Sequence, residues 1–104
     1  MVFAHIPRAE PRLLEGMRLF NEGQFFGSHE VWESLWHDVV GPERELLQGL
    51  IQVAAAYYHL SRGNRAGAGY LYRRARPRLS KWAPQHAGLD VGDFLARVDR
   101  QFAE

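Results

Sequence analysis

The sequence contains no cysteine. The protein therefore has no disulfide, no thiol nucleophile, no cysteine-ligated zinc and no iron–sulfur cluster. The sequence also lacks an apolar run close to the ~20 residues that a membrane-spanning helix needs, and residues 1–20 lack the apolar centre of a signal peptide. We therefore expect a cytoplasmic protein that makes no use of a membrane.

Acidic residues are missing from the middle of the chain. Residues 46–89 contain none, whereas residues 1–45 carry a net charge of −4 and residues 90–104 a net charge of −2, so the whole chain is only +1. The acid-free stretch holds seven bases, namely Arg62, Arg65, Arg73, Arg74, Arg76, Arg78 and Lys81. We expect their partners to be the acids of the first two predicted helices or an acidic surface on a second subunit.

These arginines raise the question of nucleic-acid binding. Five of them would form its footprint: Arg65, Arg73, Arg74, Arg76 and Arg78. They fall at the margin of an apolar stripe or beyond it, as in an ordinary amphipathic helix, and no nucleic-acid-binding motif accompanies them. We therefore do not expect nucleic acid as a partner.

Apolar periodicity predicts an all-α fold, a small bundle of about five helices in one domain that spans residues 1–104. The chain shows no alternation typical of a strand. The helices are predicted at residues 11–22, 28–39, 42–62, 65–82 and 90–104, with Asn64 and Asp90 as N-caps and a kink at Pro77.

The predicted helix over residues 42–62 is apolar almost all round, which is typical of the buried centre of a bundle. Its main polar stripe consists of Gln48, Gln52 and His59, with Ala55 between them. Because this helix is apolar on two sides, a second copy of the chain could cover one of them. A homodimer is therefore one expected partner arrangement.

The preceding predicted helix adds a second polar pair. His29 and Glu33 are four residues apart and share one face, at the edge of the apolar arc that contains Trp32 and Trp36. Glu30 turns towards solvent. If the two helices pack together, His29 and Glu33 join Gln48, Gln52 and His59 in a buried polar cluster beneath the two tryptophans. Trp32, Trp36 and Ala55 are then expected to line a pocket at this cluster.

Three chemical interpretations of this cluster remain open. The side chains of His29, Glu33 and His59 could bind a divalent metal, or they could act without one as the acid–base groups of a hydrolase. Alternatively, the cluster is a hydrogen-bonded network that fixes how the two helices pack. The zincin motif is absent, no second helix repeats the glutamate–histidine pair, and we predict no cofactor.

Four ordered blocks of sequence resemble one family. They are residues 20–26 (FNEGQFF), 29–36 (HEVWESLW), 48–56 (QGLIQVAAA), and His59 with Gly63-Asn64 and Gly67-Ala68. The chain resembles the domain-of-unknown-function family 309, small bacterial and archaeal proteins with relatives in plastids, over about residues 18–83. The resemblance implies an all-α fold and no assigned activity. It places the family's characteristic polar residues at His29, Glu30, Glu33, Gln48, Gln52 and His59.

The function that we predict is a small binding or interaction domain, whose partner is a small ligand, another protein or a second copy of the chain. The polar cluster is then either structural or the lining of a ligand pocket. The alternative is the hydrolase that uses His29, Glu33 and His59, either with a metal or through acid–base chemistry.

Overall fold

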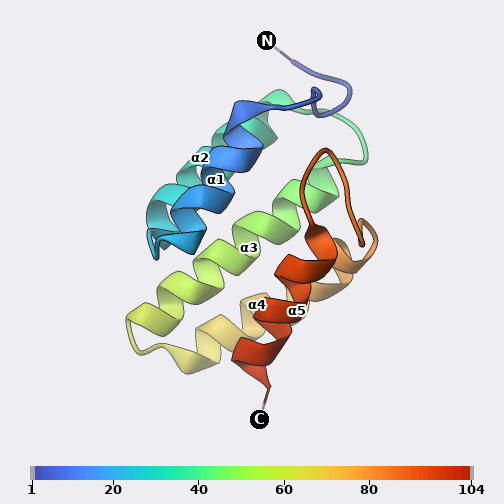
Figure 1. The fold of residues 1–104 in the computed structure, drawn as a ribbon. Coiled ribbons are helices and arrows are strands. Elements are labelled where there is room, and N and C mark those ends of the chain that lie inside the picture. The colour runs from blue at the N-terminus through green and yellow to red at the C-terminus, as the bar shows by residue number, and fades with distance from the viewer. Residues whose placement is uncertain (1, 104) are drawn as a thin grey trace.

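The computed structural model describes residues 2–103 and contains five helices (Figure 1). They are α1 (Pro11–Asn21), α2 (Phe25–Asp38), α3 (Arg44–Ser61), α4 (Arg65–Ser80) and α5 (Val91–Phe102). Residues 2–103 form no β-strand, only two isolated bridges, Phe3–Val39 and His86–Leu89. The prediction of an all-α bundle of about five helices is confirmed.

The helices form two antiparallel pairs, α1 with α2 and α3 with α4, and α5 lies against the second pair (Figure 1). Helix α3 occupies the middle, between α2 and α4, which confirms its predicted central place. Nine of its residues are buried, namely Leu46, Leu47, Gly49, Leu50, Ile51, Gln52, Val53, Ala54 and Ala56. No helix within residues 2–103 has the combination of length and hydropathy that crossing a membrane requires.

Side-chain caps mark the beginning of two helices. Asn64 accepts a hydrogen bond from the backbone of Gly67 at 2.9 Å, and Asp90 accepts one from the backbone of Asp93 at 2.9 Å. Both predicted N-caps are therefore confirmed.

Helix α2 begins earlier than the sequence predicts. It starts at Phe25, three residues before the predicted Ser28. Phe25 packs edge-on against Phe20 of α1, with 5.2 Å between the ring centroids. This tertiary contact extends the helix by most of a turn.

The basic residues of α4 find their acids in α5 and α3. Arg76 pairs with Asp99 of α5 at 3.1 Å, and Arg78 lies 3.4 Å from the carboxylate of Glu45 at the start of α3. The expectation that the acids of the first two helices are the partners is wrong for these two arginines. The physical reason is the fold, because α3 lies between α4 and the α1–α2 pair (Figure 1).

Tyr72 joins α4 to α5 in a way that makes stability depend on pH. Its hydroxyl donates to Asp99 at 2.6 Å, and its ring stacks on Phe102 with 4.5 Å between centroids. Burial raises the pKa of the Tyr72 phenol above its usual 10.0, and the bond to Asp99 raises it further. Since the folded-state pKa is the higher one, this contribution to stability is present below pH ~10 and lost as the pH rises through the folded-state pKa.

We expect Tyr72→Phe to lower the free energy of unfolding by about 1 kcal/mol at neutral pH, because the bond to Asp99 is lost. The variant should also lose less stability than the wild type between about pH 9 and pH 11, on either side of the ordinary tyrosine pKa. Urea unfolding across that range measures both effects. Tyr70→Phe, which removes an exposed phenol from the same helix, is the matched control. An unchanged alkaline slope in Tyr72→Phe would contradict the assignment.

Candidate functional site

Four of the residues predicted to form or line the site lie along one face of α3, the helix between α2 and α4. We call this face, with Gln48, Gln52, Ala55 and His59 on it, the outer face of α3. Helix α2 borders it with a stripe at helical spacing, consisting of Phe26, His29, Glu33 and Trp36. Helices α2 and α3 run antiparallel, so the start of the α2 stripe lies beside the end of the outer face of α3, and the end of the stripe lies beside its start (Figure 1). The site therefore has two distinct ends.

One end of the outer face is an aromatic hollow of about 200 Å³. It is lined by Phe26, His29, Ala55, Tyr58 and His59. Phe26 and Tyr58 lie 5.9 Å apart, and the His29 ring stacks on Phe26. Phe26 is 57% exposed and Tyr58 37%, so two large aromatic side chains meet solvent side by side.

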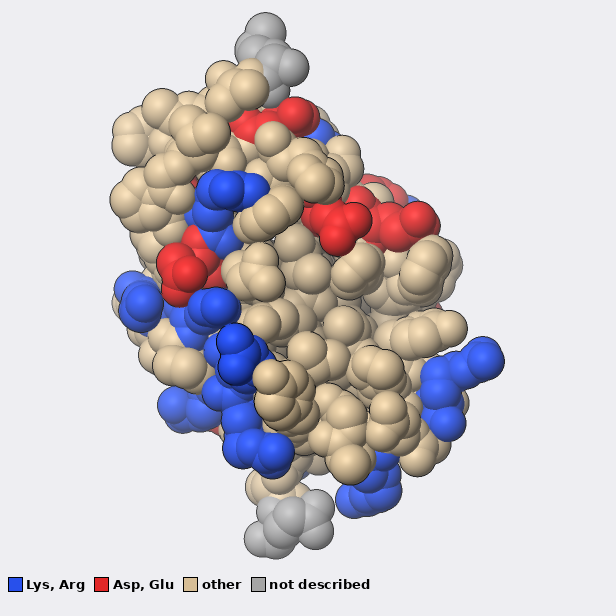
Figure 2. Space-filling view, turned by 180° about the vertical axis from the view of Figure 1, so that it is seen from behind, with Lys and Arg blue, Asp and Glu red and all other residues tan. Residues whose placement is uncertain are grey.

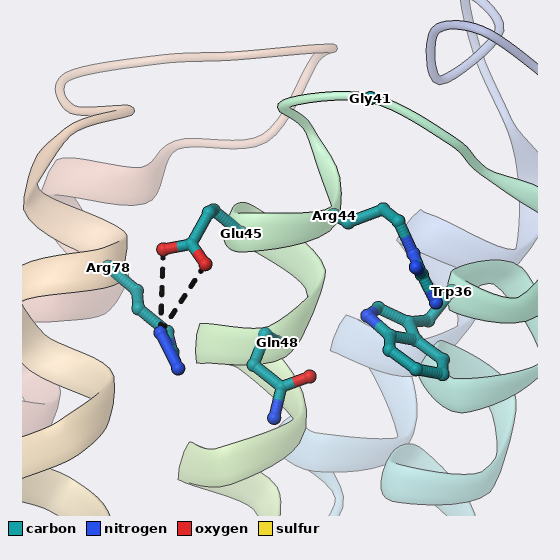
Figure 3. A pocket seen from close by; sticks show the side chains of 6 residues that line it. All are labelled: Trp36, Gly41, Arg44, Glu45, Gln48 and Arg78. Carbon is teal, nitrogen blue, oxygen red and sulfur yellow. Dashed lines mark hydrogen bonds and ion pairs between the residues drawn. The ribbon is translucent and has the colours of Figure 1, made fainter.

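The other end is a cationic hollow of about 290 Å³ (Figure 3). It is lined by Trp36, Gly41, Arg44, Glu45, Gln48 and Arg78. The Arg44 guanidinium lies over the Trp36 ring, 3.7 Å from its centroid, and Gln48 stands between this stack and Arg78 (Figure 3). The site therefore draws on three helices, α2, α3 and α4.

The charge on this side of the molecule is unevenly distributed. Seen from behind α1 and α5, basic side chains form a column along one side, the side of α4, and the middle of the face is largely uncharged (Figure 2). Arg78 and Lys81 of this region both approach Glu45, at 3.4 and 3.6 Å. The basic side of α4 therefore adjoins the cationic hollow, which Arg78 lines.

The structure does not gather the predicted polar residues into one buried cluster. His29 and His59 share the aromatic hollow, whereas Gln48 lines the cationic one. Gln52 is buried and accepts a hydrogen bond from Arg78 Nε at 3.3 Å. The predicted polar residues are thus divided between the two ends of the outer face. The reason is that they are spaced along the length of the helices and not gathered at one level.

The two glutamates of α2 face solvent. The Glu33 side chain is 49% exposed, and its Oε2 lies 3.9 Å from His29 Nε2. Glu30 is exposed, as its position on the helix predicts. Neither carboxylate is therefore buried against α3.

The two tryptophans of α2 have different roles. Trp36 lines the cationic hollow. Trp32 does not line the site, and that expectation is wrong: it is 0% exposed, and its indole Nε1 donates to the carbonyl of Leu13 at 3.1 Å. It packs directly on Gly16, where α1 has no side chain to keep the ring away. Trp32 thus belongs to the interface between α1 and α2.

The arrangement gives no support to a metal site. Within residues 2–103 no group of three or more histidine, aspartate or glutamate side chains could hold a metal ion. His59 Nδ1 lies 3.3 Å from the side-chain nitrogen of Asn64, the residue that caps α4. His29 Nδ1 is buried without a hydrogen-bond partner among the described residues.

Sequence reasoning missed two features. Glu43, just before α3, is a buried carboxylate that accepts hydrogen bonds from the backbone of Ile6 at 2.7 Å and from His86 at 2.5 Å. The second feature is the pairing of Arg44 with Trp36. Both depend on packing between separate segments, and only the high frequency of arginine over aromatic rings could have suggested the second.

The fold and the site define a small all-α domain with two hollows at opposite ends of one helix face. Residues 13–71 match the family described as domain of unknown function (DUF309), and the chain belongs to this family. The matched segment includes α2, α3 and all six polar residues that the resemblance indicates.

The chain is also similar to two proteins with no assigned function. The chain is similar to a conserved hypothetical protein of Thermus thermophilus, whose crystal structure superposes with a TM-score of 0.78 at 32% identity, covering 96% of this chain and 100% of that one. It is also 24% identical over 95 residues to an uncharacterized protein of Aquifex aeolicus (strain VF5). The match covers 90% of this chain but only 28% of the Aquifex protein.

Proposed function

We propose that this domain binds a segment of a partner protein along the outer face of α3, with an apolar side chain of that segment in the aromatic hollow. The observation that carries the proposal is the exposed pair Phe26 and Tyr58, 5.9 Å apart beside that hollow. Exposed apolar patches that stand together on a small domain mark interaction surfaces.

The dimensions of the face favour a polypeptide segment over a small metabolite. Gln48 and His59, at opposite ends, are 11 positions apart on α3, which corresponds to about 16 Å along the helix. About five residues of extended chain span that distance at ~3.3 Å per residue. The two hollows, about 200 and 290 Å³, are each smaller than most pockets that enclose a metabolite.

The hydrolase with His29, Glu33 and His59 stays a prediction without a supporting observation. His29 Nε2 and Glu33 Oε2 lie 3.9 Å apart, which is too far for a hydrogen bond between them. The interaction-domain interpretation needs no such contact. It uses the exposure of the aromatic side chains beside the hollow.

Selection from a displayed random-peptide library tests the proposal. We expect enriched peptides to share one aromatic or large aliphatic residue, and Phe26→Ser to weaken their binding about tenfold or more. Because Phe26 is 57% exposed, the variant should keep the fold. Tyr70→Ser, which removes an aromatic side chain of similar exposure from α4, is the matched control and should leave binding unchanged.

Two results would overturn the proposal. One is the absence of any enriched peptide, or equal affinity of the enriched peptides for the wild type and Phe26→Ser. The other is a homodimer, seen by light scattering, that dissociates in Phe26→Ser, because a second copy would then occupy the face in place of a partner segment.

A further inference from the structure

We propose that the cationic hollow binds a carboxylate group of the partner segment, from an acidic side chain or from the end of the chain. This inference rests on the proposed function, because it assigns the second end of the same face. It is carried by the two arginines that line the hollow, Arg44 from α3 and Arg78 from α4, with Gln48 between them (Figure 3).

Arg44 is held in a fixed orientation by its contact with Trp36. Its guanidinium lies against the Trp36 ring, 3.7 Å from the centroid, and its Nε is buried without a hydrogen-bond partner among residues 2–103. Stacking uses the face of the guanidinium and leaves its N–H groups in the plane, where a carboxylate is bound through two parallel hydrogen bonds. The stack therefore positions the Arg44 guanidinium, to which the ligand's carboxylate would bind.

Arg78 is only loosely engaged within the chain. Its Nη1 lies 3.4 Å from each oxygen of Glu45, and its Nε lies 3.3 Å from the Gln52 side chain. Hydrogen bonds between a guanidinium and a carboxylate are normally about 2.7–2.9 Å long. A carboxylate placed in the hollow could approach Arg78 more closely than Glu45 does.

The local charge favours an anion in spite of Glu45. Arg44 and Arg78 line the hollow with this carboxylate, and Lys81 lies 3.6 Å from it. When the ligand's carboxylate replaces the Glu45 carboxylate at Arg78, Glu45 can remain paired with Lys81. The Gln48 side-chain amide, between the two arginines, can donate a further hydrogen bond (Figure 3).

The test is an NMR titration of the ¹⁵N-labelled protein with three probes. N-acetylglycine represents a terminal carboxylate, the α-amide of N-acetylglutamate represents a side-chain carboxylate, and inorganic phosphate represents a free anion. We expect at least one carboxylate probe to shift the signals of the Trp36 indole N–H, the Gln48 amide and the Arg44 Nε–H with saturation. The probe that binds more tightly identifies the source of the carboxylate.

Variants decide whether the arginines are responsible. Arg44→Gln should weaken carboxylate binding about tenfold or more, and Arg44→Lys, which keeps the charge but not the planar fork, should weaken it less. Arg73→Gln removes an exposed arginine of α4 outside the hollow and should have no effect. Binding that Arg44→Gln leaves intact, or phosphate that binds as tightly as either carboxylate, would overturn the proposal.

This titration is independent of the aromatic hollow, because neither carboxylate probe carries an apolar side chain. Carboxylate binding that persists in Phe26→Ser, without any selected peptide, would mean that the proposed function fails while the cationic hollow is a carboxylate site. If selected peptides bind through Phe26 and Arg44→Gln leaves their affinity unchanged, the proposed function holds and the carboxylate site fails.

Discussion

Gly16→Ala is expected to lower the free energy of unfolding by about 3 kcal/mol, at the upper end of what overpacking a core costs. A methyl group at this position would lie 2.5 Å from Cε2 of Trp32 and closer still to its Cδ1 and Nε1. These are atoms of a rigid, fully buried ring, so no flexible side-chain end can move away. The two helices that meet here, α1 and α2, must separate instead.

Separation of α1 from α2 would also break their buried hydrogen bonds. Trp32 Nε1 donates to the carbonyl of Leu13 at 3.1 Å, and the hydroxyl of Ser28 donates to the carbonyl of Gly16 at 2.8 Å. Each buried group left without a partner costs about 1–3 kcal/mol. The close approach at Gly16 therefore supports both the packing and the polar contacts of this helix pair.

Urea unfolding of Gly16→Ala, with Gly27→Ala as the matched control, measures the effect. A methyl group at Gly27 would meet Leu19 at 3.6 Å, an ordinary contact, so that variant should be as stable as the wild type or more stable, since alanine favours a helix over glycine. In the Trp32→Phe background Gly16→Ala should cost less, because the smaller ring leaves room. Equal stability of Gly16→Ala and the wild type would show that the helices do not approach this closely.

The fold can be predicted from the sequence because its signals are local. Asn64 and Asp90 cap helices through bonds to residues three positions away, and the apolar stripes repeat with the period of the helix. The start of α2 is the exception, because Phe25 belongs to the helix through its contact with Phe20 of α1. That boundary carries no capping signal, since Gln24 makes no side-chain cap bond within the described part of the chain.

The candidate site can be predicted only as a set of residues on two helix faces. Helical spacing puts His29 with Glu33 on one helix, and Gln48 with His59 on the next. It does not show how far each side chain lies from the neighbouring helix. That distance depends on how closely the two helices approach each other. Residues elsewhere in the chain determine this approach.

The two tryptophans of α2 show this dependence. Trp32 and Trp36 share one arc of the helix, so the sequence treats them alike. Because Gly16 of α1 has no side chain, the Trp32 ring can pack directly against α1 and is fully buried there. Trp36 instead stacks against Arg44, which begins α3 after the turn that follows α2.

Glu43 is a buried charge whose role depends entirely on distant segments. Its side chain is 9% exposed, and its oxygens accept hydrogen bonds from the Ile6 backbone at 2.7 Å and from His86 Nε2 at 2.5 Å. Ile6 lies 37 positions before it and His86 43 positions after it. Glu43 thus ties the segment before α1 and the loop between α4 and α5 to the start of α3.

Glu43→Ala is expected to lower the free energy of unfolding by about 2–3 kcal/mol, because it leaves the buried Ile6 N–H and His86 without their acceptor. Urea unfolding measures this loss. Glu45→Ala is the matched control at the same helix end: its side chain is 44% exposed, and loss of its ion pairs should cost less than about 1 kcal/mol.

Amide hydrogen exchange gives a local measure of the role of Glu43 that global unfolding does not. In Glu43→Ala the Ile6 amide should exchange faster, while the amides of buried α3 residues such as Leu50 keep their relative order of protection. This difference is expected because Ile6 loses its direct acceptor, whereas the α3 amides keep their bonds within the helix. An Ile6 amide that stays as protected as in the wild type would show that Glu43 does not hold the segment before α1 in place.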